Sequence, residues 1–147
     1  MNLIDKQLFD NDIDHLVSWW RERNGLFVDL DNVLMKVAMH AKPSRDLGHP
    51  VPLLIGTESL HSKVLGSPNP KLLSLNIKSY FPEYAANVFE GYLYASEYFE
   101  PVQSVHSLVA NMSEGPVDFI YERLLLPVRT KVGAEAILTY SRPIQLN

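Results

Sequence analysis

The stretch that decides the fold is Gly115 to Ile144, GPVDFIYERLLLPVRTKVGAEAILTYSRPI. Its first half, Val117 to Val128, is rich in Val, Ile, Phe, Tyr and Leu, which are residues that strands favour. Its second half, Ala134 to Ser141, is apolar with small side chains, and a short polar turn containing Gly133 joins the two halves. Two β-type runs around a glycine-bearing turn predict an antiparallel hairpin.

A third β-type run, Val102 to Met112, comes just before the hairpin, so we expect three sequential antiparallel strands at the end of the chain. Residues 78–96 before them carry apolar side chains at helical spacing and predict a helix. Farther upstream, Val51 to Ile55 is typical of a short strand, and a helix is expected over residues 59–65. The pattern as a whole indicates an α+β fold.

The first forty residues show two helical patterns. Apolar residues fall at i, i+3, i+4 and i+7 in Ile13, Leu16, Val17 and Trp20. They predict a helix from Asn11 or Asp12 to about Arg23, ended by Asn24-Gly25, after a loose lead-in of residues 1–10. The same spacing recurs in Leu30, Val33, Leu34 and Val37. It predicts a second short helix from Asp29 or Asp31 to Met39, followed by a proline-rich loop over residues 42–52.

Composition excludes several classes of protein. The chain has 147 residues, 13 basic and 17 acidic, and a net charge of −4, which gives no footprint for nucleic acid. It has no cysteine, so disulfides and thiolate metal sites are excluded. No run is long and apolar enough for a membrane helix, and the N-terminus does not have the pattern of a secretory signal. We therefore expect a cytoplasmic protein of bacterial type.

Several segments resemble the PAS domain, in particular the short stand-alone PAS-like proteins of proteobacteria. The segments that carry the resemblance are Trp19-Trp20-Arg21, residues 29–34, Ile55-Gly56-Thr57, Leu65-Gly66 and Tyr121 to Val128. The resemblance implies a five-stranded antiparallel sheet with helices on one face, a pocket between them, and sensory or regulatory use. It divides the chain into an N-terminal helical extension, residues 1–36, and a PAS-like sensor domain, residues 37–147. The chain departs from the family pattern at residues 40–52, where a proline-rich stretch replaces a clean first strand.

Four residues are candidates for the lining of such a pocket: Tyr92, His106, Tyr121 and Arg123. Alternation along a strand places Tyr121 and Arg123 on one face of the sheet and Glu122 on the other. If the first face lines the pocket, the guanidinium of Arg123 would meet a carboxylate or phosphate; if it points outward, Arg123 pairs with surface acids. His106, in the middle of a strand, would hydrogen-bond a ligand or titrate near neutral pH.

The resemblance makes a signalling module the preferred function, one that binds a small molecule or a protein partner and catalyses nothing. A homodimer through the N-terminal helices is expected, because Trp19 and Trp20 cannot both face one core from a single helix. The alternative is a small magnesium-dependent phosphatase that uses Asp29 and Asp31 of the DxDx[TV] pattern. His61, on an expected helix, is a candidate haem ligand. We assign no catalytic or metal-binding residue and no cofactor, and expect neither nucleic acid nor membrane as a partner.

Overall fold

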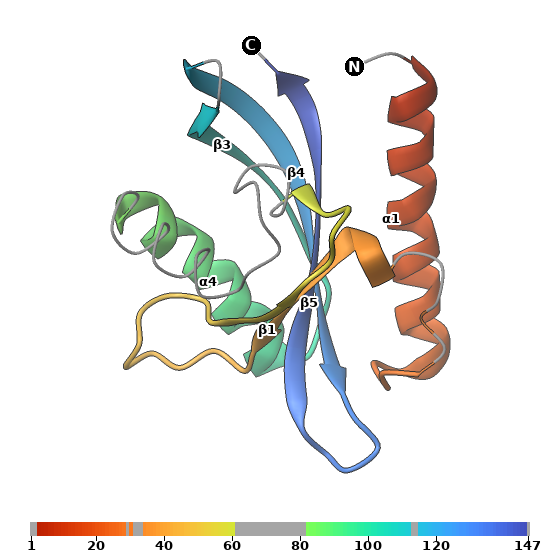
Figure 1. The fold of residues 1–147 in the computed structure, drawn as a ribbon. Coiled ribbons are helices and arrows are strands. Elements are labelled where there is room, and N and C mark those ends of the chain that lie inside the picture. Colours follow the sequence, from red (N-terminus) through yellow and green to blue (C-terminus); the bar gives the residue numbers. More distant parts are fainter. Residues whose placement is uncertain (1–2, 29, 31–33, 61–81, 113–114, 147) are drawn as a thin grey trace.

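The structure, a computed structural model, describes residues 3–28, 30, 34–60, 82–112 and 115–146. It confirms an α+β fold with two long helices and a five-stranded antiparallel sheet (Figure 1). The elements are α1 (Leu3–Arg23), the 3-10 helix η1 (Leu34–Lys36), β1 (Val37–Ala41), β2 (Pro52–Ile55), α4 (Pro82–Tyr98), β3 (Val102–Met112), β4 (Gly115–Arg129) and β5 (Glu135–Leu146).

The sheet has the strand order β2-β1-β5-β4-β3, with every neighbouring pair antiparallel. The predicted hairpin is confirmed as β4 and β5, and the third strand pairs with β4 along its whole length. Gly133 sits in the hairpin turn with φ of 86°, a conformation that glycine adopts without a steric penalty. Because β5 lies in the centre of the sheet, it carries contacts to both of its faces.

The two faces of the sheet have different helical covers, with α1 on one side and α4 on the other (Figure 1). Successive side chains of β4 point alternately into the α1 layer and the α4 layer. Leu124 and Leu126 pack with Leu16 and Trp19 of α1, whereas Leu125 packs with α4. The central strands are therefore buried on both faces, which explains why LLLPV reads as a continuous apolar run.

Two predictions for the first forty residues are wrong. Helix α1 begins at Leu3, so residues 3–10 are not a loose lead-in, although its predicted end at Arg23 is confirmed. The short helix predicted through Met39 is replaced by η1 and β1. Strand β1 forms a ladder with β5 over its full length, so sheet pairing overrides the helical spacing of the apolar residues.

The predictions for the middle of the chain agree better with the structure. The strand predicted from Val51 is present as β2, the loop before it separates β1 from β2, and the helix predicted near residues 78–96 is α4. The first strand of the sheet, which the sequence does not show clearly, is β1. It pairs with β2 through a register shift between Met39 and His40. The helix expected at residues 59–65 lies almost wholly outside the described residues.

Both tryptophans of α1 contact their own chain. Trp19 is buried, and its indole N–H donates to the Val28 carbonyl over 2.8 Å. Trp20 is half-buried, donates to the Pro127 carbonyl, and lies against Phe99 with ring centroids 5.9 Å apart. One tryptophan is thus partly exposed, as expected, but it already has partners in this chain. The tryptophans therefore do not by themselves require a second chain.

Candidate ligand-binding site

Arg123 occupies the middle of β4 and projects into the layer between the sheet and α4. Its side chain is 2% exposed. One terminal nitrogen donates to the Val88 carbonyl of α4 over 3.2 Å, and the guanidinium carbon lies 5.2 Å from the centre of the Tyr92 ring. Within the part of the chain that the structure describes, no carboxylate pairs with it and its Nε has no hydrogen-bond partner. A buried cation without a counter-ion is costly, so this position is unlike an ordinary core residue.

Helix α4 leaves room for this guanidinium at Gly91. A Cβ built at Gly91 would stand 2.5 Å from a terminal nitrogen of Arg123 and 3.3 Å from the Leu125 side chain. Any larger residue here would push the guanidinium aside. The glycine costs the helix about 0.5 to 1 kcal/mol of stability relative to alanine, and its missing side chain leaves the space beside the Arg123 guanidinium.

Tyr92 begins a chain of buried polar contacts. Its hydroxyl is 3.0 Å from the Thr139 hydroxyl of β5, which is in turn 3.0 Å from Nδ1 of His40 on β1. The His40 and Tyr92 rings meet edge to face at 5.0 Å. Burial raises the pKa of Tyr92, so the phenol stays protonated. This series of contacts links α4 to the neighbouring strands β5 and β1.

His106 and Tyr121 form the neighbouring part of the cluster. They are opposed residues of β3 and β4, with ring centroids 5.5 Å apart, and His106 Nε2 is hydrogen-bonded to the Ser104 hydroxyl at 2.8 Å. Desolvation first, and the Arg123 charge second, lower the pKa of His106 to about 4. Burial raises the pKa of Tyr121, with the Arg123 charge opposing it. Both rings are therefore neutral at pH 7.

The structure brings the four candidate residues together on the α4 side of the sheet, around Arg123. Of the two orientations that the sequence left open, Arg123 takes the inward one, and Glu122 points to the α1 side, where it pairs with Arg142. Desolvation and the Arg123 charge lower the pKa of His106, which disfavours the alternative in which it titrates near neutral pH.

Sequence reasoning missed three polar members of this layer: His40, Thr139 and Ser141. His40 was missed because its segment carries a helical pattern rather than an alternating one. Thr139 and Ser141 did give a signal, since they alternate with Leu138 and Tyr140 along β5. Small polar residues at every second place of a central strand indicate a face that is not wholly apolar.

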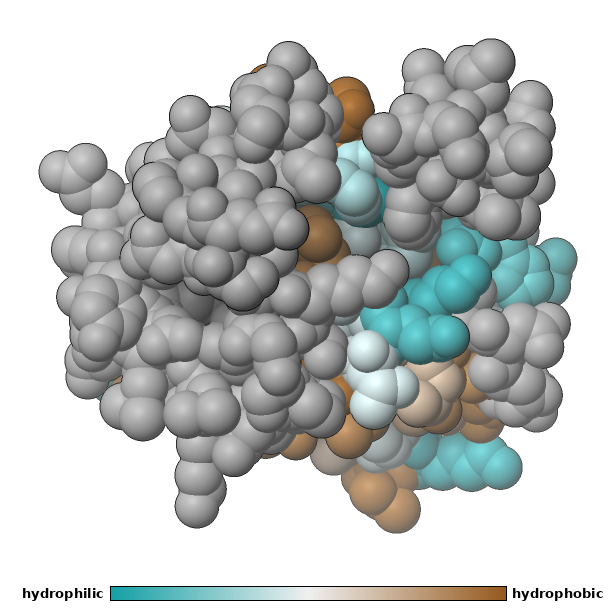
Figure 2. Space-filling view, turned by 45° about the horizontal axis from the view of Figure 1, so that its top comes forward, coloured by the Kyte–Doolittle hydropathy of each residue, from teal (hydrophilic) through white to brown (hydrophobic). Residues whose placement is uncertain are grey.

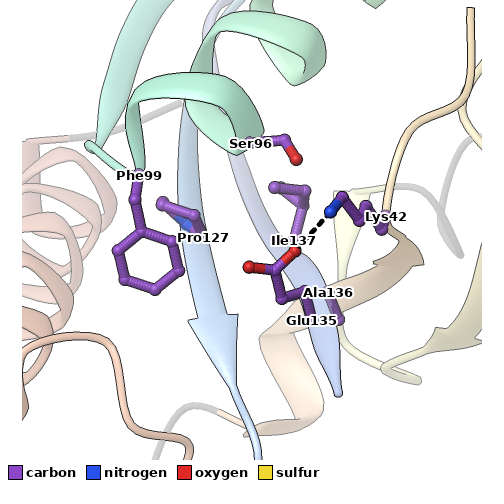
Figure 3. A pocket seen from close by; sticks show the side chains of 7 residues that line it. All are labelled: Lys42, Ser96, Phe99, Pro127, Glu135, Ala136 and Ile137. Carbon is purple, nitrogen blue, oxygen red and sulfur yellow. Dashed lines mark ion pairs between the residues drawn. The ribbon is translucent and has the colours of Figure 1, made fainter. Parts of the chain in front are cut away.

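A separate hollow lies at the C-terminal end of α4 (Figure 3). Its volume is about 180 Å³, including space open to solvent, and its lining residues are Lys42, Ser96, Phe99, Pro127, Glu135, Ala136 and Ile137. Lys42 and Glu135 are ion-paired across it at 2.7 Å, and this pairing lowers the pKa of Glu135. Its charges already satisfy each other, so the Arg123 cluster is the stronger candidate site.

The coloured part of the face drawn in Figure 2 offers less than this interior layer. Figure 2 shows hydrophilic and hydrophobic side chains interspersed over the coloured part of the face it presents. That part shows no continuous apolar area of the kind that marks a docking site. Within the described ranges, no group of three or more His, Asp or Glu side chains is arranged to hold a metal ion, and no helix is long and apolar enough to cross a membrane.

Two earlier candidates, Asp29 with Asp31 and His61, lie outside the described residues. Comparison with protein families, with curated proteins and with solved structures gives no match. The case for a function therefore rests on the geometry of this chain.

Proposed function

We propose that this chain is a sensory or regulatory module of the PAS type. It binds a small molecule between α4 and the sheet, passes the change on to a signalling protein, and catalyses no reaction of its own. The observation that carries the proposal is Arg123, a buried guanidinium without a carboxylate partner among the described residues. The five-stranded antiparallel sheet is the architecture that the PAS resemblance implies, and it supports the same proposal.

The sheet offers a short route from this site to α1. Thr139 lies in the α4 layer, and the next residue, Tyr140, lies in the α1 layer. The Tyr140 hydroxyl donates to the Asp12 carboxylate of α1 over 3.3 Å, and Lys36 pairs with the same oxygen at 3.0 Å. A ligand that favours one position of β5 would shift the population of α1 positions in the same sense. We place the signalling surface, and the homodimer contact of a cytoplasmic protein, on α1.

Native mass spectrometry of the purified protein, with an absorption spectrum of the same sample, tests the proposal. A bound small molecule supports it and gives the ligand class by mass and colour. The test of the non-enzymatic part is hydrolysis of a generic phosphate ester with magnesium, because Asp29 and Asp31 carry a phosphatase-like pattern. Activity that disappears in Asp29→Asn would overturn the proposal.

A further inference from the structure

Three polar residues form a row across the sheet under α4. Arg123 of β4 is directly opposed by Ser104 on β3 and by Ser141 on β5. Directly opposed residues of antiparallel strands have Cβ atoms about 5 Å apart and project to the same face. The row thus places one serine on each side of Arg123, in the same layer as Tyr92 and Thr139.

Two atoms of this row have no hydrogen-bond partner among the described residues: Arg123 Nε and Ser141 Oγ. Both are buried, and they belong to directly opposed residues. Nearly all buried polar groups in proteins are hydrogen-bonded, so two unsatisfied ones on directly opposed residues need an explanation. A carboxylate supplies it, since one oxygen accepts from the Nε–H and the other from the hydroxyl.

The charges around the row select a singly charged ligand. Arg123 is the one cation that faces it from the described parts of β3, β4, β5 and α4. His106 contributes no charge at neutral pH, and Tyr121 stays protonated. Glu90 of α4 is exposed, and Glu122 is held on the opposite face by Arg142. One guanidinium balances one carboxylate, whereas a phosphate dianion would need more cations or donors.

We propose that Arg123 and Ser141 bind the carboxylate of a small organic acid in the layer between α4 and β4–β5. This inference rests on the proposed function and names the ligand class of the same site. Because both atoms are buried, the acid reaches them only when α4 moves away from the sheet. Binding therefore selects the displaced position of α4, and this selection makes the site a sensor rather than a static pocket.

Thermal unfolding of the full chain with simple acids tests the inference. Acetate, butyrate and benzoate are compared at pH 7 and constant ionic strength with acetamide, butyramide and benzamide, which have the same shapes without the charge. We expect at least one acid to raise the unfolding temperature by about 5 °C or more at roughly 100 times its Kd, while its amide does not. Sodium phosphate should give no comparable rise.

Variants assign the effect to the row. Arg123→Met keeps the length of the side chain without its charge and should abolish the rise, and Ser141→Ala should weaken binding about 3- to 10-fold. Arg142→Met is the matched control, because this arginine lies on the opposite face in an ion pair, and its response to the acid should equal that of the unaltered protein. If Arg123→Met fails to fold, Ser141→Ala and the acid–amide comparison still decide.

Several results overturn the inference. They are equal responses to acid and amide, a response to phosphate alone, a response that Arg123→Met retains, and no response to any of the probes. Native mass spectrometry separates this failure from failure of the proposed function. A neutral molecule that co-purifies with both the unaltered protein and Arg123→Met would overturn the carboxylate site and leave the sensory function standing.

Discussion

At the scale of the residue, Arg123 is where the chain departs most from an ordinary core. Its neighbours in space are a backbone carbonyl, the face of Tyr92 and the helix at Gly91. The tyrosine face offers a favourable cation–π contact, about 2 kcal/mol when desolvated, which falls short of the cost of burying a lone charge. The residue therefore lowers the stability of the empty protein and favours any state in which an anion reaches it.

Removing that charge should therefore not destabilise the empty protein. We expect Arg123→Met, freed of any bound molecule, to unfold in urea at the same or a higher midpoint than the unaltered protein, because it removes an uncompensated buried charge. Arg142→Met, which breaks the pair with Glu122, should lose about 1 to 3 kcal/mol. A clear loss of stability in Arg123→Met would show that the guanidinium is already satisfied.

His106 gives a pH-dependent prediction at the same scale. Its folded-state pKa, about 4, is below the usual 6.5, so the unfolded chain binds the proton more readily. The contribution of neutral His106 to the free energy of unfolding is fully present above pH 6.5. It is lost progressively as the pH falls from there towards 4. An NMR titration of His106 should have its midpoint near 4, and in Arg123→Met the midpoint should rise only partly, because desolvation is the larger cause. A midpoint at 6.5 contradicts the buried geometry.

At the scale of the element, two close contacts fix the positions of the helices. The end of α1 meets the end of α4 where Gly25 lies against the Phe99 ring, and the middle of α1 is tied to the sheet by Asp12. Phe99 itself has φ of 50° and lies 3.9 Å from the Arg129 guanidinium. These contacts decide how firmly each helix sits on its face.

Gly25→Ala should be strongly destabilising. The position has φ of 79°, and a Cβ would stand 2.5 Å from the Phe99 ring, so strain and overlap add to a loss of about 2 to 5 kcal/mol in urea unfolding. Gly133→Ala is the matched control, because its φ is 86° but nothing lies within 4 Å of the added carbon. It should lose only about 1 to 2 kcal/mol. Equal losses would refute the close approach of α1 and Phe99.

Tyr140→Phe tests the tie between β5 and α1. It removes the hydroxyl that donates to Asp12 and should cost about 1 kcal/mol in urea unfolding. Combined with Asp12→Asn, the two losses should be non-additive by about 0.5 kcal/mol or more, as expected for residues in contact. Tyr94→Phe, on the exposed side of α4, serves as the control and should change nothing. Strictly additive losses would show that Tyr140 and Asp12 do not interact, which would contradict the proposed route from the site to α1.

At the scale of the whole molecule, the sheet separates the layer under α4, which holds the Arg123 cluster beside apolar residues, from the layer under α1. The same two strands, β4 and β5, line both layers through alternate residues. A displacement of these strands on one face therefore cannot leave the other face unchanged, because a close-packed interior transmits strain. Under the proposed function, α1 would therefore report events under α4.

Much of this architecture can be predicted from the sequence, because β4, β5 and α4 have strong local patterns. The inward direction of Arg123 could not be, since a shift of one residue in register reverses every side chain. The nature of β1 was hidden because its apolar residues continue a helical spacing, and only pairing with β5 decides otherwise. His40 belongs to the site through its contact with Thr139, on a strand distant in sequence, which no local pattern reveals.

The measurement that tests the central claim most directly is the ¹H–¹⁵N signal of the Arg123 Nε–H, assigned by its absence in Arg123→Met. The account predicts a signal protected from solvent exchange that shifts when the acid selected by thermal unfolding is added, and that does not shift with the matching amide. A signal that exchanges as fast as that of an exposed arginine, or that ignores every acid, would contradict it.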